Sequence, residues 1–249
     1  MSEPILISRA DGVCELRLNR PEKRNAITFA MYQGLLRGLT EAQADDSIRA
    51  VLFSGEGAGF CAGNDLNDFL DGPAFTAEHP VMGFLHTLAG FEKPLVAAVH
   101  GQCVGIGVTL LLHCDLVIAA RGTQLSMPFV KLGLVPEAAS SLLLPRLVGH
   151  QRAAELLLLG RPLDAASAER LGLVNQVVEE TALLTEARAL ARTLAQQPNG
   201  ALTATRRLLR GDIAAVHAQI DAEARVFGTQ LRSEEFRVAV RAVLKARAG

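Results

Sequence analysis

Short apolar runs alternate along the first half of the chain with segments in which apolar residues recur every three or four positions. The runs at 48–54 and 95–99 are predominantly apolar, which is typical of strands that are covered on both faces. Ahead of them, Met31, Leu35 and Leu39 follow Thr28 at helical spacing, and a threonine there is suited to cap a helix. Two shorter strands flank the turn at 11–12. The pattern predicts an α/β fold.

The order strand, glycine-rich loop, helix occurs twice, at 48–70 and at 95–113. The first loop reads GEGAGFCAGNDL and the second HGQCVGIG, and each leads into the start of a helix. The first turn of a helix leaves backbone N–H groups without partners inside the helix, so such loops can present donors to a negatively charged oxygen. We expect the two units to place both loops at the same edge of the core.

The chain is helical almost throughout after residue 179. Four helical segments are expected at 182–196, 199–210, 212–230 and 233–246, separated by Pro198, Gly211 and Ser233. Their apolar faces cannot all be covered within one thin layer, so we expect them to pack on the core and on a neighbouring subunit. The domain boundary is accordingly predicted near residue 195, with a core at 1–195 and a helical oligomerisation region at 196–249.

Composition excludes several classes of protein. Of the 249 residues 49% are hydrophobic and 20% charged, so the chain can bury a substantial core. The net charge is −1 and no block of Lys or Arg stands out, which argues against nucleic acid as a partner. Four cysteines without CxxC spacing indicate small buried residues in a reducing compartment rather than a zinc site or a disulfide framework.

Targeting signals and membrane spans are not expected. The N-terminal segment carries early acids and no long apolar stretch, unlike a signal peptide. The most apolar segment, 104–120, is interrupted by His113 and Asp115, so it reads as a buried helix followed by a strand rather than a membrane span. We therefore expect no membrane partner and a cytoplasmic location.

Glu137, which follows Pro136 on a predicted loop, is the candidate for acid–base chemistry, although it could also be an exposed loop acid. Asp65 could cap a helix or face a pocket, and Asp115 reads as a structural carboxylate. His100 and His113 lack partners at metal-ligand spacing and are expected in hydrogen-bonding roles. No GxSxG sequence surrounds a serine, so a hydrolytic triad is unsupported. The serines at 140–141 are expected to cap the following helix.

The segments FCAGNDL, KPLVAAVHGQCVGIGVTLLLHCDLVIAA and SMPFVKLGLVPE resemble the crotonase (enoyl-CoA hydratase/isomerase) superfamily. RPEKRNAI near the start and GLVNQVV at 172–178 match in order and spacing, so the resemblance covers essentially the whole chain. Within this superfamily, the chain most resembles the peroxisomal-type Δ3,Δ2-enoyl-CoA isomerases. The resemblance implies an α/β spiral of ββα units with a C-terminal helical trimerisation region, assembled as a homotrimer or a dimer of trimers.

The resemblance also implies the site. The backbone N–H groups of Ala62 and Ile106 would form an oxyanion hole for the carbonyl of an acyl-CoA thioester, and Glu137 would be the catalytic acid–base. The two glutamates with which the hydratases hold water are replaced by Thr109 and Phe129. The remaining residues expected to contact the substrate or its CoA are Lys23, Arg24, Asn25, Gly63, Asn64, Asp65, Leu66 and Gly105. Arg206, Arg207 and Lys245 are candidates for CoA phosphates.

One carboxylate suffices to move a proton from C2 to C4 as a double bond shifts into conjugation, so the resemblance implies a Δ3,Δ2-enoyl-CoA isomerase of fatty-acid or related acyl-CoA catabolism. No metal and no cofactor is needed, since coenzyme A is part of the substrate. Two alternatives stay open. The first is a hydratase or other crotonase chemistry with water held by an unidentified residue, and the second is an acyl-CoA-binding protein that has lost catalysis.

Overall fold

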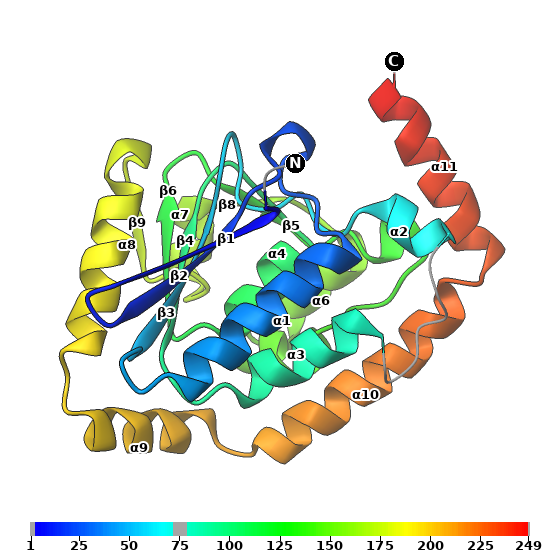
Figure 1. Ribbon diagram of the computed structural model, residues 1–249. Helices are drawn as coiled ribbons and strands as arrows, with labels where there is room; N and C mark the ends of the chain where they lie inside the picture. The colour runs from blue at the N-terminus through cyan, green and yellow to red at the C-terminus, as the bar shows by residue number, and fades with distance from the viewer. Residues whose placement is uncertain (1–2, 72–78, 249) are drawn as a thin grey trace.

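A six-stranded sheet forms the centre of the computed structural model, which describes residues 3–71 and 79–248 (Figure 1). Its strand order is β1-β2-β3-β4-β6-β9. The first pair is an antiparallel hairpin that turns at Asp11 and Gly12, and all other pairs are parallel. The strands are β1 (Ile5–Ala10), β2 (Val13–Leu18), β3 (Ala50–Gly55), β4 (Leu95–Val99), β6 (Leu116–Ala120) and β9 (Gln176–Val178). The predicted hairpin and both predicted apolar strands are confirmed.

A small second sheet lies at one edge of the core, in the order β5-β7-β8. Its strands are β5 (Gln102–Val104), β7 (Gln124–Ser126) and β8 (Leu163–Asp164). An isolated parallel bridge between Cys61 and Cys103 joins the first glycine-rich loop to the second. The two loops therefore meet at the same edge, as the repeated strand–loop–helix order predicts.

Helices cover both faces of the large sheet. On one face α1 (Phe29–Ala44) packs against α3 (Pro80–Gly90), and on the other α8 (Glu180–Ala195) crosses β3, β4 and β6. The predicted cap of α1 is confirmed, because the Thr28 side chain accepts a hydrogen bond from the Met31 amide. The other helices and turns are η1 (Pro21–Lys23), α2 (Leu66–Asp71), η3 (Val130–Leu132), α5 (Ser140–Val148), α6 (His150–Leu159) and α7 (Ala165–Arg170).

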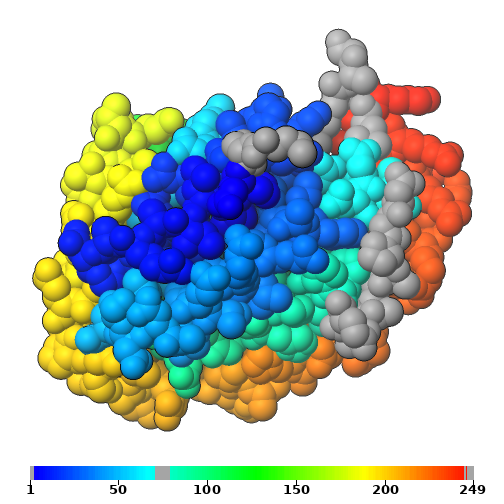
Figure 2. All heavy atoms as spheres, in the orientation of Figure 1, coloured from blue at the N-terminus to red at the C-terminus, as the bar shows by residue number. Residues whose placement is uncertain are grey.

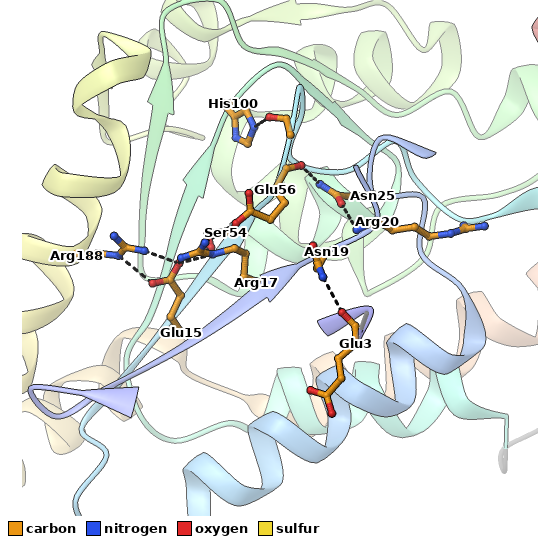
Figure 3. Close-up of polar contacts among 11 residues, drawn as sticks. Glu3, Glu15, Arg17, Asn19, Arg20, Asn25, Ser54, Glu56, His100 and Arg188 are labelled. Atoms are coloured by element: carbon orange, nitrogen blue, oxygen red, sulfur yellow. Dashed lines mark hydrogen bonds and ion pairs between the residues drawn. The ribbon is translucent and has the colours of Figure 1, made fainter. Parts of the chain in front are cut away.

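The buried carboxylate of Glu15 fastens α8 to the sheet (Figure 3). It accepts hydrogen bonds from Arg188 of α8 at 2.9 Å, from Ser54 of β3 at 2.7 Å and from Arg17 of its own strand at 2.9 Å. Burial raises the pKa of Glu15, but the bonds from Arg188 and Ser54 and the charge of Arg17 outweigh it, so the net shift is downward. This carboxylate therefore stays ionised as a structural hub.

The apolar segment at 104–120 divides into three short elements: α4 (Ile106–Thr109), the 3-10 turn η2 (Leu110–His113) and the strand β6. The predicted helix and strand are thus present, although the helix tightens in its second half. In the part of the chain that the structure describes, no helix is long and apolar enough to cross a membrane. The polar loop expected at 71–80 falls mostly at 72–78, outside the described residues.

The C-terminal helices α9 (Asn199–Arg210), α10 (Ile213–Gln230) and α11 (Glu234–Ala248) run along one edge of the molecule and continue past α3 (Figures 1 and 2). The side chains of Ile220, Phe227 and Val240 belong to the same apolar cluster as the sheet. These helices therefore help to build the core, and the domain boundary near residue 195 stays a prediction.

Candidate active site

A cavity of about 270 Å³ opens where the two glycine-rich loops meet. Its wall combines both loops with the segment that follows β7 and with two C-terminal helices. The lining residues are Ala62, Gly63, Asn64, Leu66, Val104, Gly105, Ile106, Pro128, Phe129, Lys131, Leu132, Leu134, Phe227 and Val243. The structure thus brings together most of the residues expected to contact substrate, and the wall that they form is largely apolar.

Two backbone amides at this cavity have no acceptor among the residues that the structure describes. Ile106 is the first residue of α4, so its N–H lies ahead of the helix's own hydrogen bonds. The Ile27 amide donates to the Gly63 carbonyl, and the Ile27 carbonyl accepts from the Asp65 amide, as in a parallel bridge. The N–H of Asn64, which lies between Gly63 and Asp65, therefore faces away from Ile27. Both residues line the cavity, and both amides can donate to a ligand oxygen.

The expected donor at Ala62 is wrong. Its N–H donates to the carbonyl of Arg24 at 2.9 Å and is therefore occupied within the protein. Gly63 follows in the left-handed region, with φ +88°, and turns the backbone between the two amides. The free amide is two residues further along, at Asn64, whose side-chain oxygen also accepts a hydrogen bond from the buried Tyr32 hydroxyl at 2.6 Å. Tyr32 therefore fixes the orientation of Asn64.

Glu137 is buried, with 6% of its surface exposed, and it lies behind the cavity wall rather than among the described lining residues. Thr109 donates a hydrogen bond of 2.5 Å to its Oε1, while its Oε2 is buried and has no hydrogen-bond partner among the described residues. Burial raises the pKa of Glu137 to about 8, Thr109 lowers it and the charge of Glu223 raises it. The side chain is therefore a weak acid that can gain or lose a proton near neutral pH.

The loop that carries Glu137 is held in an unusual backbone conformation. Ala138 and Ala139 follow with φ of +59° and +56°, in the left-handed region that costs a non-glycine residue about 1–3 kcal/mol. His113 Nε2 lies 2.8 Å from the Ala138 carbonyl oxygen, and the Ser140 hydroxyl donates to the Glu137 carbonyl at 2.6 Å. The hydrogen-bonding role predicted for His113 is confirmed.

The expected capping role of the two serines after Glu137 is wrong. Helix α5 begins at Ser140, and its N-cap residue Ala139 offers no side-chain hydrogen bond. Instead Glu223 of α10 accepts from the backbone amides of Ala139 at 2.7 Å and Ser141 at 2.9 Å. Sequence reasoning missed Glu223, although its place on the apolar stripe of α10, between Ile220 and Phe227, was a usable signal.

Two other predicted contacts, Asn25 and Asp65, are used inside the protein. The side chain of Asn25 is fully buried and bonds the Arg20 amide and the Glu56 and Gly59 carbonyls, so it shapes the loop and does not line the cavity (Figure 3). Asp65 pairs with Arg20 at 2.6 Å and accepts from the Asn67 amide. Of its two predicted roles, the structure therefore supports the helix cap.

The structure also separates the candidates for CoA phosphates. Arg206 is buried, pairs with Asp115 at 2.7 Å and donates to the Phe91 carbonyl, so it is not available to a phosphate and this expectation is wrong. Asp115 is the structural carboxylate that the sequence predicts, since it also accepts from the Leu95 amide. The cations Lys23, Arg24, Arg207 and Lys245 are exposed, although Arg24 donates to Gln102 and Arg207 lies 3.8 Å from Glu92.

Cysteine and histidine positions fit the sequence predictions. All four cysteines are free, with Cys14, Cys61 and Cys103 buried. His100 Nε2 lies 2.8 Å from the Gly57 carbonyl oxygen, so this histidine holds the first glycine-rich loop (Figure 3). Within residues 3–71 and 79–248, no group of three or more His, Cys, Asp and Glu side chains could hold a metal ion.

Two backbone donors at an apolar cavity, together with a buried acid, are groups suited to a carbonyl compound whose neighbouring carbon exchanges a proton. The chain matches the family model "Enoyl-CoA hydratase/isomerase" over residues 8–248. It belongs to this family, the crotonase superfamily, and has its fold. It is therefore an enzyme of the enoyl-CoA hydratase/isomerase family, for which an acyl-CoA substrate is consistent.

Relatives of known name carry several activities. The chain is 38% identical to 1,2-epoxyphenylacetyl-CoA isomerase of Escherichia coli, covering 99% of this chain and 97% of that one. It is 37% identical to Enoyl-CoA delta isomerase 2 of Rattus norvegicus, covering 94% of this chain and 61% of the relative. Among solved structures, Pseudomonas aeruginosa OdaA has 45% identity and a TM-score of 0.94, covering 97% of this chain and 99% of that one. The family is established, while the particular reaction has to be argued from the site.

Proposed function

We propose that this enzyme shifts a double bond of an enoyl-CoA from position 3 to position 2, with Glu137 as its single acid–base. The observation that carries this proposal is the environment of Glu137, a buried carboxyl with one threonine partner and a pKa raised to about 8. A base that titrates near the working pH is suited both to take a proton and to return it. The reaction belongs to fatty-acid or related acyl-CoA catabolism.

The mechanism starts with the thioester oxygen between the amides of Asn64 and Ile106. The Glu137 carboxylate removes a proton from C2, and the electron pair left behind forms an enolate whose charge rests on that oxygen. Each such preorganised donor is typically worth about 3–4 kcal/mol in the transition state. The C2–C3 double bond then forms as the electron pair of the C3–C4 double bond takes the same proton from Glu137 at C4. Atoms and charge balance, and Glu137 returns to its starting state.

The cavity wall disfavours addition of water. Phe129 and Thr109 stand where the resemblance places the two water-holding glutamates of the hydratases, and no carboxylate occurs among the lining residues described above. Thr109 is fully buried and directs its hydroxyl to Glu137. An apolar wall beside the enolate leaves proton return to C4 as the favoured outcome.

Proton NMR of a 3-enoyl-CoA incubated with the enzyme in D2O tests the proposal, because it follows isomerisation, hydration and C2 exchange together. We expect a conjugated 2-enoyl-CoA as the main product, lost in Glu137→Gln and retained in a control at the exposed Glu179, Glu179→Gln. Undiminished turnover by folded Glu137→Gln would refute it. Formation of 3-hydroxyacyl-CoA at a comparable rate would favour a hydratase, and binding without C2 exchange would favour a non-catalytic acyl-CoA-binding protein.

A second candidate is isomerisation of a ring epoxide, supported by the match along nearly the whole chain to 1,2-epoxyphenylacetyl-CoA isomerase. The side-chain amide of Asn64 supports it further. Since its oxygen is held by Tyr32, its NH2 group remains to donate to an oxygen on the acyl group. The same NMR assay with 1,2-epoxyphenylacetyl-CoA decides between the two, and the preferred substrate is the one with the higher kcat/KM.

We also propose that the C-terminal helices assemble the chain into a homotrimer or a dimer of trimers. Leu208 and Leu209 of α9 are 83% and 82% exposed, and burial of such side chains favours association. The exposed cations Lys23, Arg24, Arg207 and Lys245 are proposed to meet the CoA phosphates. Light scattering after size-exclusion chromatography measures the assembly, and a monomer at micromolar concentration would refute it. The cytoplasmic location stays a prediction.

A further inference from the structure

We propose that Glu223 of α10 is a positioning residue for the reaction: it holds the loop that presents Glu137 and places a fixed negative charge beside that base. This inference rests on the proposed role of Glu137. It assigns to a C-terminal helix a direct part in setting the chemistry of a residue that lies 86 positions earlier in the chain.

The contacts of Glu223 are those of an anion bound by a helix start. Its two oxygens accept from the amides of Ala139 and Ser141, and the Ser141 hydroxyl adds a third hydrogen bond at 2.5 Å. Gln219, one turn earlier on α10, donates to the same hydroxyl at 2.9 Å. Glu223 is only 6% exposed and its hydrogen bond from the Ala139 amide is buried, so solvent cannot replace it as the acceptor of that amide.

A short stretch of backbone connects Glu137 to the amides that Glu223 holds. Ala138 and Ala139, both in the left-handed region, connect Glu137 to the amides that Glu223 holds, so the loop keeps this course only while those amides have their acceptor. Loss of the carboxylate would leave the buried Ala139 amide unpaired at the start of α5, and the loop would relax toward ordinary backbone angles. The carboxyl of Glu137 would then move relative to Asn64 and Ile106.

The two carboxyl groups cannot both be ionised at low cost, because both are buried and the charge of Glu223 raises the pKa of Glu137. Burial also raises the pKa of Glu223, but Glu223 accepts three hydrogen bonds from the described residues and Glu137 one, so Glu223 ionises before Glu137 as the pH rises. The other groups that face Glu137 in the described structure are Thr109 from α4, Tyr32 from α1 and Cys61 from the first loop. Each is uncharged near neutral pH, since burial raises the pKa of the tyrosine and the cysteine.

His113 completes the surroundings of the loop and is also uncharged. Burial lowers its pKa to about 4, and it remains a neutral donor to the Ala138 carbonyl. Glu223 is therefore the charged group that accepts directly from the amides of the loop, whereas the charges of Arg206 and Arg210 act on His113. A helix cap that acted only on stability would leave the titration of Glu137 unchanged, and this separates the two roles.

The test is the pH profile of kcat/KM in Glu223→Gln, with Asp221→Asn as the control on the same helix, where the side chain of Asp221 is half exposed. We expect Glu223→Gln to lose at least tenfold in kcat and its ascending midpoint to move to lower pH by roughly one unit. Asp221→Asn should match the wild type in both. An unchanged midpoint in folded Glu223→Gln would overturn the inference, however slow the variant is.

A second variant and a second measurement keep the outcome clear. If Glu223→Gln does not fold, Glu223→Asp decides: it keeps the charge but shortens the reach, so we expect the wild-type midpoint with a kcat reduced at least tenfold. Wild-type turnover in Glu223→Asp would overturn the positioning role. If the wild type shows no isomerisation, the proposed function fails alone, and carbon-13 NMR titration of the Glu137 carboxyl, assigned with Glu137→Gln, still tests whether Glu223 shifts it.

Discussion

Glu15 and Glu137 are equally buried carboxyl groups with opposite behaviour. Each has 6% of its surface exposed. Glu15 sits between Arg17 and Arg188 with Ser54 beside it, and its pKa is lowered despite burial. Glu137 has only Thr109 for a partner, and burial raises its pKa to about 8. Strand β2, inside the sheet, and the loop before α5 thus use the same type of side chain, one for structure and the other for chemistry.

The difference shows that the ion-pair and hydrogen-bond partners of a buried carboxyl group, rather than its burial, decide whether its pKa is lowered or raised. Two guanidinium groups replace the hydration that Glu15 loses, so its charge is permanent and it fastens α8 to the sheet. Glu137 receives no cation, and one of its oxygens has no partner, so its charge is costly and its proton is exchangeable. Failure of any of the following predictions would contradict the assignment of Glu15 to structure and Glu137 to chemistry.

The largest expected effect is on turnover in Glu137→Gln. Removing the only acid–base should reduce kcat by about a thousandfold, within the range typical of general acid–base groups. Steady-state kinetics with a 3-enoyl-CoA measures it. Glu15→Gln, at the equally buried structural carboxyl, should keep wild-type kcat per folded molecule. Comparable losses in both variants would show that burial alone explains them.

The next effect is on stability in Glu15→Gln. The substitution leaves Arg17 and Arg188 facing an amide in a buried setting, and breaking a buried ion pair costs about 3–5 kcal/mol. Because Arg188 is partly exposed, we expect a smaller cost than for a fully buried pair, about 2–3 kcal/mol. Urea unfolding followed by circular dichroism measures it. Glu137→Gln should unfold at equal or higher urea than the wild type, and the reverse order would contradict the comparison.

The pH dependence of stability should differ in sign between the two groups. The folded-state pKa of Glu137 is raised, so the folded protein holds a proton that the unfolded chain has lost between about pH 4.5 and 8. As the pH rises through this range, Glu137 therefore lowers the free energy of unfolding by up to about 1.4 kcal/mol per pH unit. Glu15 has a lowered pKa, so its stabilisation is present above its ordinary value and is lost as pH falls through the folded-state value. Unfolding curves of the wild type and the two glutamine variants, measured from below pH 4.5 for Glu15 up to about pH 8 for Glu137, separate the contributions, and parallel curves would contradict the assignment.

The smallest expected effect is in Thr109→Val. Its hydroxyl lowers the pKa of Glu137, so its loss should move the ascending midpoint of kcat/KM to higher pH and cost about 1 kcal/mol, roughly fivefold in rate. Thr123→Val removes another buried threonine hydrogen bond, to the Val99 carbonyl, and should leave the midpoint unchanged. A shift to lower pH in Thr109→Val would mean that Thr109 does not stabilise the carboxylate.

Much of the fold could be predicted from the sequence because it depends on local patterns. The apolar runs at β3 and β4 and the glycines that follow them placed the two loops at one edge, and Thr28 marked the start of α1. Glu137 could be found because a lone acid after a proline fits the family motif. These signals lie within a few residues of the feature that they predict.

The errors share a different origin, since each concerns contacts between distant segments. The loss of the Ala62 amide to Arg24 depends on how the loop at 20–25 folds against the first glycine-rich loop. Arg206 was a candidate phosphate ligand because the sequence does not reveal its ion pair with Asp115. Glu223 was overlooked because its partners lie 82 and 84 residues away. Periodicity shows that a side chain is buried, but it does not show which polar group receives it.

The dependence of the catalytic loop on α10 also has a consequence for synthesis. A growing chain that has reached β9 already contains the sheet, both glycine-rich loops and Glu137 itself. The amides of Ala139 and Ser141 still lack their acceptor at that stage, and Phe227 has not yet closed the cavity. The acceptor that holds the catalytic loop is therefore synthesised roughly 45 residues after β9, the last strand of the sheet.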